Sequence, residues 1–226
     1  MTQVSPLEGH DLWAPVYDSA VNPIVLLERR STLELLGNLR PSTLLDVACG
    51  TGYWLRHFDR AGSTVFGIDL SQEMLNEARN SPSLKRRLIL AHAECLPVAP
   101  STADLVLCSL SLGYFENLGF AFHEFARVAK PGAYIAVSDV HPYALRAGWK
   151  RSFKLGAERY DIAHHVREMD EIKLAAANAG LACTTLRSVH FGLPEFPLFR
   201  RAGKERLFWS ARALPALFAG LWQNPC

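Results

Sequence analysis

The chain has 226 residues, and its 24 lysines and arginines nearly balance 22 aspartates and glutamates, for a net charge of +2. This length suits one α/β domain with additions and is short for two full domains. A charge this close to neutral excludes the strongly basic footprint of a nucleic-acid-binding domain. We therefore expect no nucleic-acid partner, and the sequence leaves the oligomeric state open.

The cysteines and the apolar runs indicate in which compartment of the cell the protein is expected. The cysteines are Cys49, Cys95, Cys108, Cys183 and Cys226. They are scattered without a paired spacing, which argues against a disulfide framework or a metal site and favours a reducing cytosol. The first residues lack a basic stretch followed by an apolar run, so no signal peptide is expected. The apolar run at 213–222 is too short to cross a bilayer. These features predict a cytoplasmic protein without membrane insertion.

Apolar runs alternate with helical segments along most of the chain. Residues 1–40 are expected to form a helical cap, with a helix over Ile24–Leu36. The runs that predict strands are Thr43–Ala48, Thr64–Asp69, Arg87–Ala91, Leu105–Ser109 and Ala133–Ser138; helices are expected at Tyr53–Ala61, Gln72–Ser81 and Leu118–Val128. Continuous apolar runs are typical of strands buried on both faces, and the alternation indicates βαβ units. The sequence therefore predicts a doubly wound, mostly parallel, Rossmann-like α/β sheet.

The part after the fifth strand is less regular. Lys130-Pro131-Gly132 is expected to end a helix before that strand. Residues 141–167 form a long connection at its carboxyl end, where open α/β sheets bind ligands, and are expected to be a substrate lid. A helix over Glu168–Ala179 and a strand over Leu181–Val189 should follow. We expect one domain, divided into a cap (1–40), a core (41–140), a lid (141–167) and a C-terminal helix with closing strands (168–226).

The turn after the first strand has the composition of a ligand-binding loop. Gly50 and Gly52 remove side chains where the backbone turns sharply. The helix that follows presents unpaired N–H groups to a ligand. A dinucleotide fingerprint would need a further glycine at position 55, which is Leu55, so a nicotinamide cofactor is disfavoured.

Asp69 ends the second strand, where a carboxylate can accept both hydrogen bonds of a ribose diol. Alone, a Gly-x-Gly segment is usually only a turn, and an aspartate before Ser71 is usually only a helix cap. Together, at the ends of two successive strands, they indicate a nucleoside site.

Five segments follow one another in a characteristic order. They are LLDVACGTGYW (Leu44–Trp54), GIDLSQEML (Gly67–Leu75), AECLPV (Ala93–Val98), DLVLCSLSLGYF (Asp104–Phe115) and RVAKPGAYIAVSD (Arg127–Asp139). This ordered set resembles the class I S-adenosylmethionine (SAM)-dependent methyltransferases, in the small-molecule branch related to quinone methyltransferases. The resemblance is close over residues 40–140 and looser beyond. It implies SAM as cofactor and S-adenosylhomocysteine as product.

The resemblance also implies a set of cofactor-binding residues. They are Asp46, Ala48, Gly50, Gly52, Asp69, Leu70, Met74, Ala93, Glu94, Ser109 and Tyr114. The first four would surround the methionine part, with Asp46 facing its ammonium group. Asp69 would hold the ribose hydroxyls, and the next four would lie beside the adenine. Ser109 and Tyr114 would lie near the sulfonium.

Two positions depart from the family pattern. Ala48 replaces the first glycine of the loop, which is compatible with the pattern if φ is negative there. His92 stands where the family often has an aspartate that binds the adenine amino group; a neutral imidazole can accept that bond through one nitrogen.

The implied chemistry is undemanding because a sulfonium methyl group is already activated, and the enzyme mainly has to hold a nucleophile in line with it. A general base is needed only if the acceptor arrives protonated. The candidates are His141 after the fifth strand, Tyr17 in the cap and His165 in the lid. A structural reading stays open for each, as a loop histidine bonded to backbone or a tyrosine that packs the cap.

These observations predict a SAM-dependent methyltransferase that acts on a small, aromatic or apolar acceptor, with O- or C-methylation favoured. The fourth-strand motif reads CSLS and lacks the Pro-Pro pair typical of enzymes that methylate exocyclic base amines. Two alternatives remain: a non-catalytic SAM- or nucleotide-binding protein, and a nicotinamide-dependent oxidoreductase.

Overall fold

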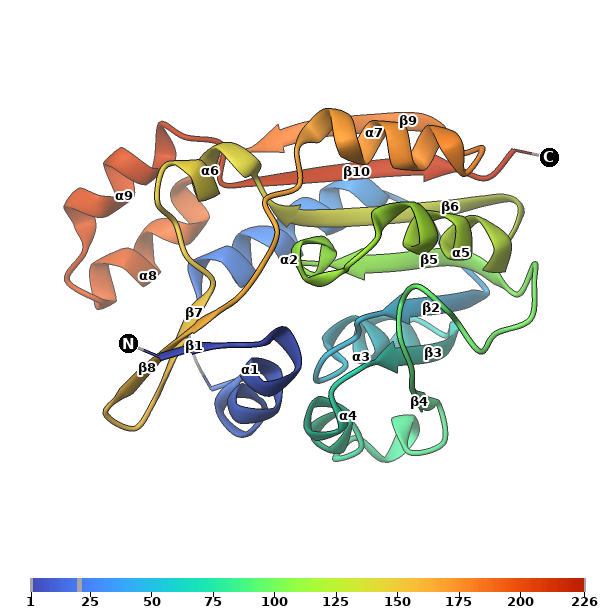
Figure 1. Cartoon of the computed structure of the whole chain (residues 1–226), viewed down its shortest axis with the longest axis horizontal. Helices are drawn as coiled ribbons and strands as arrows, with labels where there is room; N and C mark the ends of the chain where they lie inside the picture. The colour runs from blue at the N-terminus through green and yellow to red at the C-terminus, as the bar shows by residue number, and fades with distance from the viewer. Residues whose placement is uncertain (1, 20–21, 226) are drawn as a thin grey trace.

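A computed structural model describes residues 2–19 and 22–225 and contains a seven-stranded sheet with the order β4-β3-β2-β5-β6-β10-β9 (Figure 1). Its strands are β2 (Thr43–Val47), β3 (Thr64–Asp69), β4 (Leu88–Leu90), β5 (Ala103–Ser109), β6 (Ala129–Val140), β9 (Ala182–Val189) and β10 (Leu217–Gln223). The first five lie parallel to their neighbours, whereas β10 runs antiparallel to both β6 and β9. The predicted doubly wound, mostly parallel fold is confirmed.

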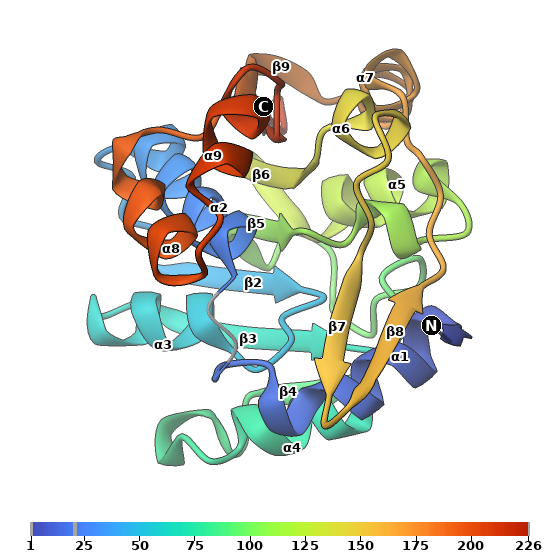
Figure 2. The same ribbon diagram turned by 90° about the vertical axis from the view of Figure 1, so that its left-hand side faces the viewer.

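Helices cover both faces of this sheet. They are α1 (Pro6–Trp13), α2 (Pro23–Leu36), α3 (Tyr53–Arg60), α4 (Gln72–Ala78), α5 (Leu118–Val128), α6 (Pro142–Arg146), α7 (Met169–Asn178), α8 (Phe196–Arg201) and α9 (Glu205–Arg212). Short 3-10 turns are η1 (Ala14–Val16), η2 (Pro82–Leu84), η3 (Leu112–Tyr114) and η4 (Leu193–Glu195). The views in Figures 1 and 2 show α3 on the opposite face of the sheet from α5 and α7.

The central strands explain why continuous apolar runs form this sheet. Leu44 and Leu45 are successive residues of β2 and are both buried, but they point to opposite faces. Leu44 packs with Trp54 and Leu55 of α3, whereas Leu45 packs with Phe122 of α5. Each face of the sheet therefore has its own apolar core.

The N-terminal cap and the connection after β6 form one unit. A second, three-stranded sheet has the order β1-β8-β7, with β1 (Thr2–Val4), β7 (Ser152–Leu155) and β8 (Glu158–Ile162). β1 lies parallel to β8, and the rings of Trp13 and Phe153 stack with centroids 5.0 Å apart. The cap was predicted as helical throughout and begins instead with a strand, because that strand is completed only by distant residues of the lid. Figure 2 shows α1 beside β7 and β8.

Two further features differ from the sequence-based expectation. Lys130-Pro131-Gly132 lies inside β6 rather than before it, although α5 does end at Val128. The backbone there is held by the C-terminal tail: Asn224 accepts a hydrogen bond from the Gly132 amide and donates to the Lys130 carbonyl. The second difference is that α8 and α9, which the sequence did not predict, fill the connection from β9 to β10.

Cys49, Cys95, Cys108 and Cys183 are free thiols, and Cys226 lies outside the described residues. Among residues 2–19 and 22–225, no group of histidine, cysteine and acidic side chains is arranged to hold a metal ion. No described helix is both long enough and apolar enough to span a membrane.

Candidate functional site

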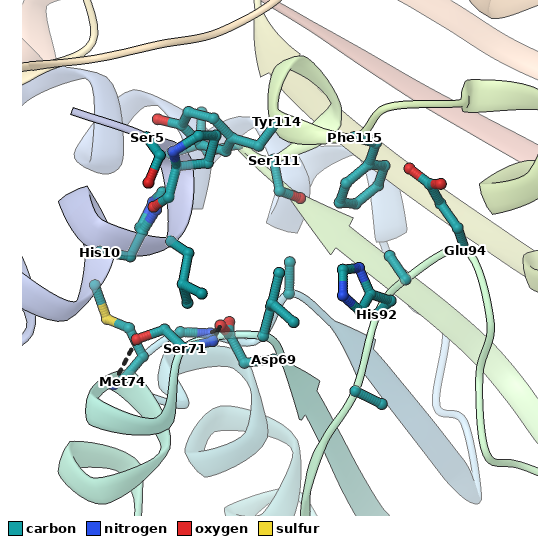
Figure 3. A pocket seen from close by; sticks show the side chains of 18 of the residues that line it. Ser5, His10, Asp69, Ser71, Met74, His92, Glu94, Ser111, Tyr114 and Phe115 are labelled. Carbon is teal, nitrogen blue, oxygen red and sulfur yellow. Dashed lines mark hydrogen bonds between the residues drawn. The ribbon is translucent and has the colours of Figure 1, made fainter. Parts of the chain in front are cut away.

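A cavity of about 260 Å³ opens at the carboxyl ends of β2, β3 and β5, with α1 and the η3 turn as its outer wall (Figure 3). Nine of the eleven residues predicted to bind the cofactor line it: Ala48, Gly50, Asp69, Leu70, Met74, Ala93, Glu94, Ser109 and Tyr114. Parallel strands bring residues far apart in the chain to the same edge of a sheet, and the first loop and the end of the second strand therefore meet here.

The loop after β2 is held open by left-handed backbone. Ala48, Gly50 and Gly52 have φ values of 58°, 53° and 81°. The negative φ under which Ala48 would fit the family pattern without strain is therefore not found. A left-handed alanine is strained because its Cβ crowds the backbone, and the loop tolerates this where it lies against the cavity. Gly50 faces open space, since a Cβ built on it would meet no atom within 4 Å.

Gly52 has a different role from Gly50. It is the N-cap of α3 and does not line the cavity. A Cβ there would lie 3.0 Å from Leu84 Cδ1 and 3.3 Å from the Cβ of Ala78. Gly52 is required for the turn and for packing against η2, so the structure gives it no direct contact with a ligand in the cavity.

Asp69 joins the loop to the end of β3. Its Oδ2 accepts a 2.7 Å hydrogen bond from the Gly50 amide, and its Oδ1 accepts a 2.8 Å bond from the Ser71 amide. Burial raises the pKa of Asp69, while these backbone donors and the nearby His10 oppose the rise. A carboxylate oxygen has more than one lone pair, and Asp69 keeps acceptor capacity toward the cavity.

Asp46 lies deeper, beside a second, small cavity of about 60 Å³. This cavity shares Tyr17, Ala48, Gly50 and other lining residues with the first and therefore lies next to it. Asp46 is 1% exposed, and its Oδ2 has no hydrogen-bond partner among the described residues. Burial raises the pKa of Asp46 well above its ordinary value, and the Glu28 and Asp69 carboxylates raise it further. A buried, unpartnered carboxylate oxygen is the feature that a ligand's ammonium group would satisfy.

Leu70, Met74, Ala93 and His92 also line the main cavity. Glu94 also lies there, and its Oε1 accepts a 3.0 Å hydrogen bond from the Asn117 amide. Figure 3 shows His92 and Glu94 on the side of the cavity away from His10. The apolar side chains and the two polar ones form a wall suited to a purine ring.

The three candidate bases occupy different places. Tyr17 is in the shared wall of both cavities, and burial raises its pKa. His141 lies outside the lining of either cavity, caps α6 by accepting from the Tyr143 amide and contacts Ser188. His165 also lies outside the lining; its amide donates to the Gly113 carbonyl and its ring is 3.9 Å from Glu116 at the rim.

His10 is a cavity residue that the sequence analysis did not identify. Its Nδ1 lies 2.6 Å from the Pro6 carbonyl oxygen, which can only accept, so Nδ1 carries the proton and Nε2 keeps its lone pair. Burial lowers the pKa of His10, which keeps the ring neutral. Ser5 before Pro6 was the sequence signal that a helix begins there, since serine is a helix-capping residue. The sequence does not show which side of α1 faces the cavity, and His10 could not be identified for this reason.

A buried ion pair supports the wall from behind. Arg151 Nη2 donates to Asp139 Oδ1 at 2.5 Å, and Arg151 Nη1 donates to the Leu110 carbonyl at 2.9 Å. Asp139 Oδ2 accepts from the Gly113 amide, and the guanidinium lies 4.7 Å from the centre of the Tyr114 ring. The lid therefore fixes the η3 turn, although Arg151 itself does not line the cavity.

A doubly wound sheet with a nucleoside-sized cavity at its carboxyl edge defines a Rossmann-like class of protein. Residues 45–137 match the family model described as "Methyltransferase domain". Within this fold, residues 45–137 therefore resemble a methyltransferase domain. Over 87% of this chain and 97% of the other, the structure also resembles the S-adenosylmethionine dependent methyltransferase from Mesorhizobium loti, with a TM-score of 0.68 at 21% identity.

Curated relatives are similar over the same core. The "Biotin biosynthesis bifunctional protein BioHC" of Saccharophagus degradans is 31% identical over 65% of this chain and 28% of its own length. The "Malonyl-[acyl-carrier protein] O-methyltransferase" of Pseudescherichia vulneris is 35% identical over 56% of this chain and 50% of its own length. The matched part is thus half or less of each of these relatives.

Proposed function

We propose that the protein transfers the methyl group of SAM to a small acceptor molecule. The observation that carries this proposal is that Gly50, Asp69 and the unpartnered Asp46 carboxylate line two adjacent cavities. An adenosyl sulfonium has a chemical group that fits each of these residues. The left-handed loop leaves room for such a ligand to approach the protein backbone.

Each part of the site has a distinct task in this proposal. Asp46 pairs with the methionine ammonium, and Asp69 accepts from the ribose hydroxyls while it holds the Gly50 amide in place. Leu70, Met74, Ala93, His92 and Glu94 enclose the adenine. The cofactor supplies an activated methyl group, so the chain has to place an acceptor in line and exclude water, for which α1 and the η3 turn provide the outer wall of the cavity.

We favour O- or C-methylation of a small acceptor with aromatic or apolar character. The outer part of the cavity presents Leu110, Tyr114 and Phe115. The names of the curated relatives make a malonyl thioester on an acyl-carrier protein a specific acceptor to test. A carboxylate acceptor is already an anionic nucleophile and requires no base. A phenolic acceptor requires one, and His10, which lines the same cavity as Tyr17, offers its Nε2. The scattered cysteines agree with a cytoplasmic enzyme.

The proposal is tested with a labelled methyl donor, purified protein and a panel of phenols, carboxylates and malonyl thioesters. We expect transfer of label to one class and formation of S-adenosylhomocysteine. Thermal unfolding with SAM and with NAD separates the alternatives. A ligand at 100 times its Kd stabilises by about 2.7 kcal/mol, which raises Tm by roughly 5–10 °C in a chain of this size. Stabilisation by NAD alone would indicate an oxidoreductase, and SAM binding without any transfer would indicate a binding protein.

A further inference from the structure

Glu28 is a buried acid that the proposed function leaves unused. It lies in α2, is 2% exposed and lines the small cavity together with Asp46. Its Oε1 accepts a 2.7 Å hydrogen bond from Thr32 Oγ1 and a 2.9 Å bond from Ser138 Oγ. Both of these bonds end on Oε1, and among the described residues no hydrogen bond within 3.5 Å ends on Oε2.

Glu28 has no ion-pair partner among the described residues, although Arg29 lines the same cavity and partly offsets the rise that burial causes in the pKa of Glu28. Among the described residues, no lysine, arginine or histidine forms an ion pair with Glu28 or Asp46. Arg29, the next residue of α2, lies instead over the Tyr53 ring, with its guanidinium carbon 3.5 Å from the ring centre. A buried acid without a cationic partner is costly, and two acids on one cavity of about 60 Å³ repel each other. A cation brought by a ligand would relieve both effects.

We propose that Glu28 and Asp46 together form a two-carboxylate seat for the ammonium group of the cofactor's methionine part, and that binding of this group releases a proton from the pair. The inference rests on the proposed function, since it needs a ligand with an adenosyl-methionine framework. Thr32 and Ser138 fix the position of Glu28 from α2 and β6, while Asp46 approaches from β2.

The release of a proton follows from the surroundings of the pair. Burial raises the pKa of Glu28, and the hydroxyls of Thr32, Ser109 and Ser138 oppose the rise. The charged and titratable groups around Glu28 are Asp46 of β2, Arg29 of α2 and Tyr17 after η1. Because burial raises the proton affinity of both acids and the Glu28 carboxylate raises that of Asp46 further, the empty seat holds a proton that an ammonium ion displaces.

Calorimetric titration with two probes tests the assignment. S-adenosylhomocysteine carries the ammonium group, whereas 5′-methylthioadenosine has the same nucleoside without the amino-acid part. We expect Glu28→Gln to lower the affinity for S-adenosylhomocysteine about tenfold or more and to leave that for methylthioadenosine within about twofold. Glu34→Gln is the matched control, because Glu34 is on the same helix, half exposed and paired with Arg30.

The wild-type protein gives an independent test that does not depend on the folding of a variant. The heat of binding is measured at pH 7 in phosphate and in Tris, which differ in ionisation enthalpy. We expect a buffer-dependent difference for S-adenosylhomocysteine and none for methylthioadenosine, which controls for groups around the ribose. Equal losses for both probes in Glu28→Gln, unchanged affinities, or heats independent of buffer would overturn the inference. Failure of the wild-type chain to bind either probe would instead overturn the proposed function and remove the seat with it.

Discussion

Asp69 connects the loop after β2 to the end of β3, and its two oxygens accept from the Gly50 and Ser71 amides. We expect Asp69→Asn to weaken SAM binding by roughly 1.5–3 kcal/mol for each charge-assisted bond that is lost. Titration calorimetry measures the change. Asp59→Asn is the control. Asp59 is a residue of α3, lies outside the cavity lining and pairs with Arg87. Unchanged affinity in Asp69→Asn would remove Asp69 from the ribose site.

Gly50 and Gly52 have similar backbone conformations but different surroundings. An alanine in a left-handed conformation costs roughly 1–2 kcal/mol, and this cost applies to both. We expect Gly50→Ala to lose cofactor affinity in addition, because its methyl group enters the cavity. Gly52→Val should mainly lower the free energy of unfolding, because its side chain meets Leu84 and Ala78. Urea unfolding and SAM titration of each variant separate the effects, with Gly62→Ala as the control for strain alone.

His10 and His141 provide a comparison of two possible bases. With an acceptor that arrives protonated, we expect His10→Gln to lower the transfer rate by about 10²–10⁴ and to leave SAM affinity nearly unchanged. His141→Ala should mainly remove the cap of α6, at a cost of about 1 kcal/mol in stability. Single-turnover rates across pH test both. A lowered transfer rate in His141→Ala together with a normal transfer rate in His10→Gln would instead support His141 as the base, as the sequence suggested.

At the scale of elements, α1 closes the cavity because β1, which precedes it in the chain, pairs with β8 of the three-stranded sheet. Gly9 allows this approach: a Cβ on it would lie 2.8 Å from Ile162 Cγ1 and 3.1 Å from Val4 Cγ2. We expect Gly9→Val to push α1 away from β8, to lower stability by about 1–3 kcal/mol and to weaken cofactor binding. Glu8→Gln, exposed on the same helix, is the control. Hydrogen exchange should show faster opening of β1 in the Gly9 variant, and normal exchange together with normal affinity would contradict the role of α1 as a wall.

At the scale of the whole molecule, the buried acids make stability depend on pH. Burial raises the pKa of Asp46 in the folded state, so between its unfolded and folded pKa values the folded chain binds more protons. The free energy of unfolding of the ligand-free protein should therefore fall as pH rises through this window, by about 1.4 kcal/mol for each tenfold difference in proton affinity. Asp46→Asn should remove much of this fall.

Urea unfolding between pH 4 and pH 9 measures this dependence. Asp170→Asn, whose side chain is 94% exposed, is the control and should keep the wild-type profile. Because the proposed ligand brings a cation to the same place, saturating SAM should reduce the fall in the wild-type protein. A stability profile that rises with pH over this window would contradict the assignment of Asp46 as a buried, protonated group.

Local pattern in the sequence determined the sheet and the inner half of the site. Strand–helix alternation and apolar runs depend on neighbouring residues, which is why β3 and α5 were predicted with their observed bounds. Gly50 and Asp69 could be paired because parallel strands bring their carboxyl ends together whatever the rest of the chain does. The resemblance to the methyltransferase family added Met74 and Ala93 to the predicted site, and both line the cavity.

Only the tertiary structure determines which residues form the outer wall of the cavity and which acidic side chains are buried. β1 exists only through pairing with β8, and His10 faces the cavity only because that pairing orients α1. His141 is in the connection where a base was expected, yet its capping bond directs it elsewhere. Glu28 in an ordinary helical segment gave no signal, since burial beside Asp46 is a property of α2 packed on the sheet. These features depend on contacts between distant residues, and a local sequence pattern does not encode such contacts.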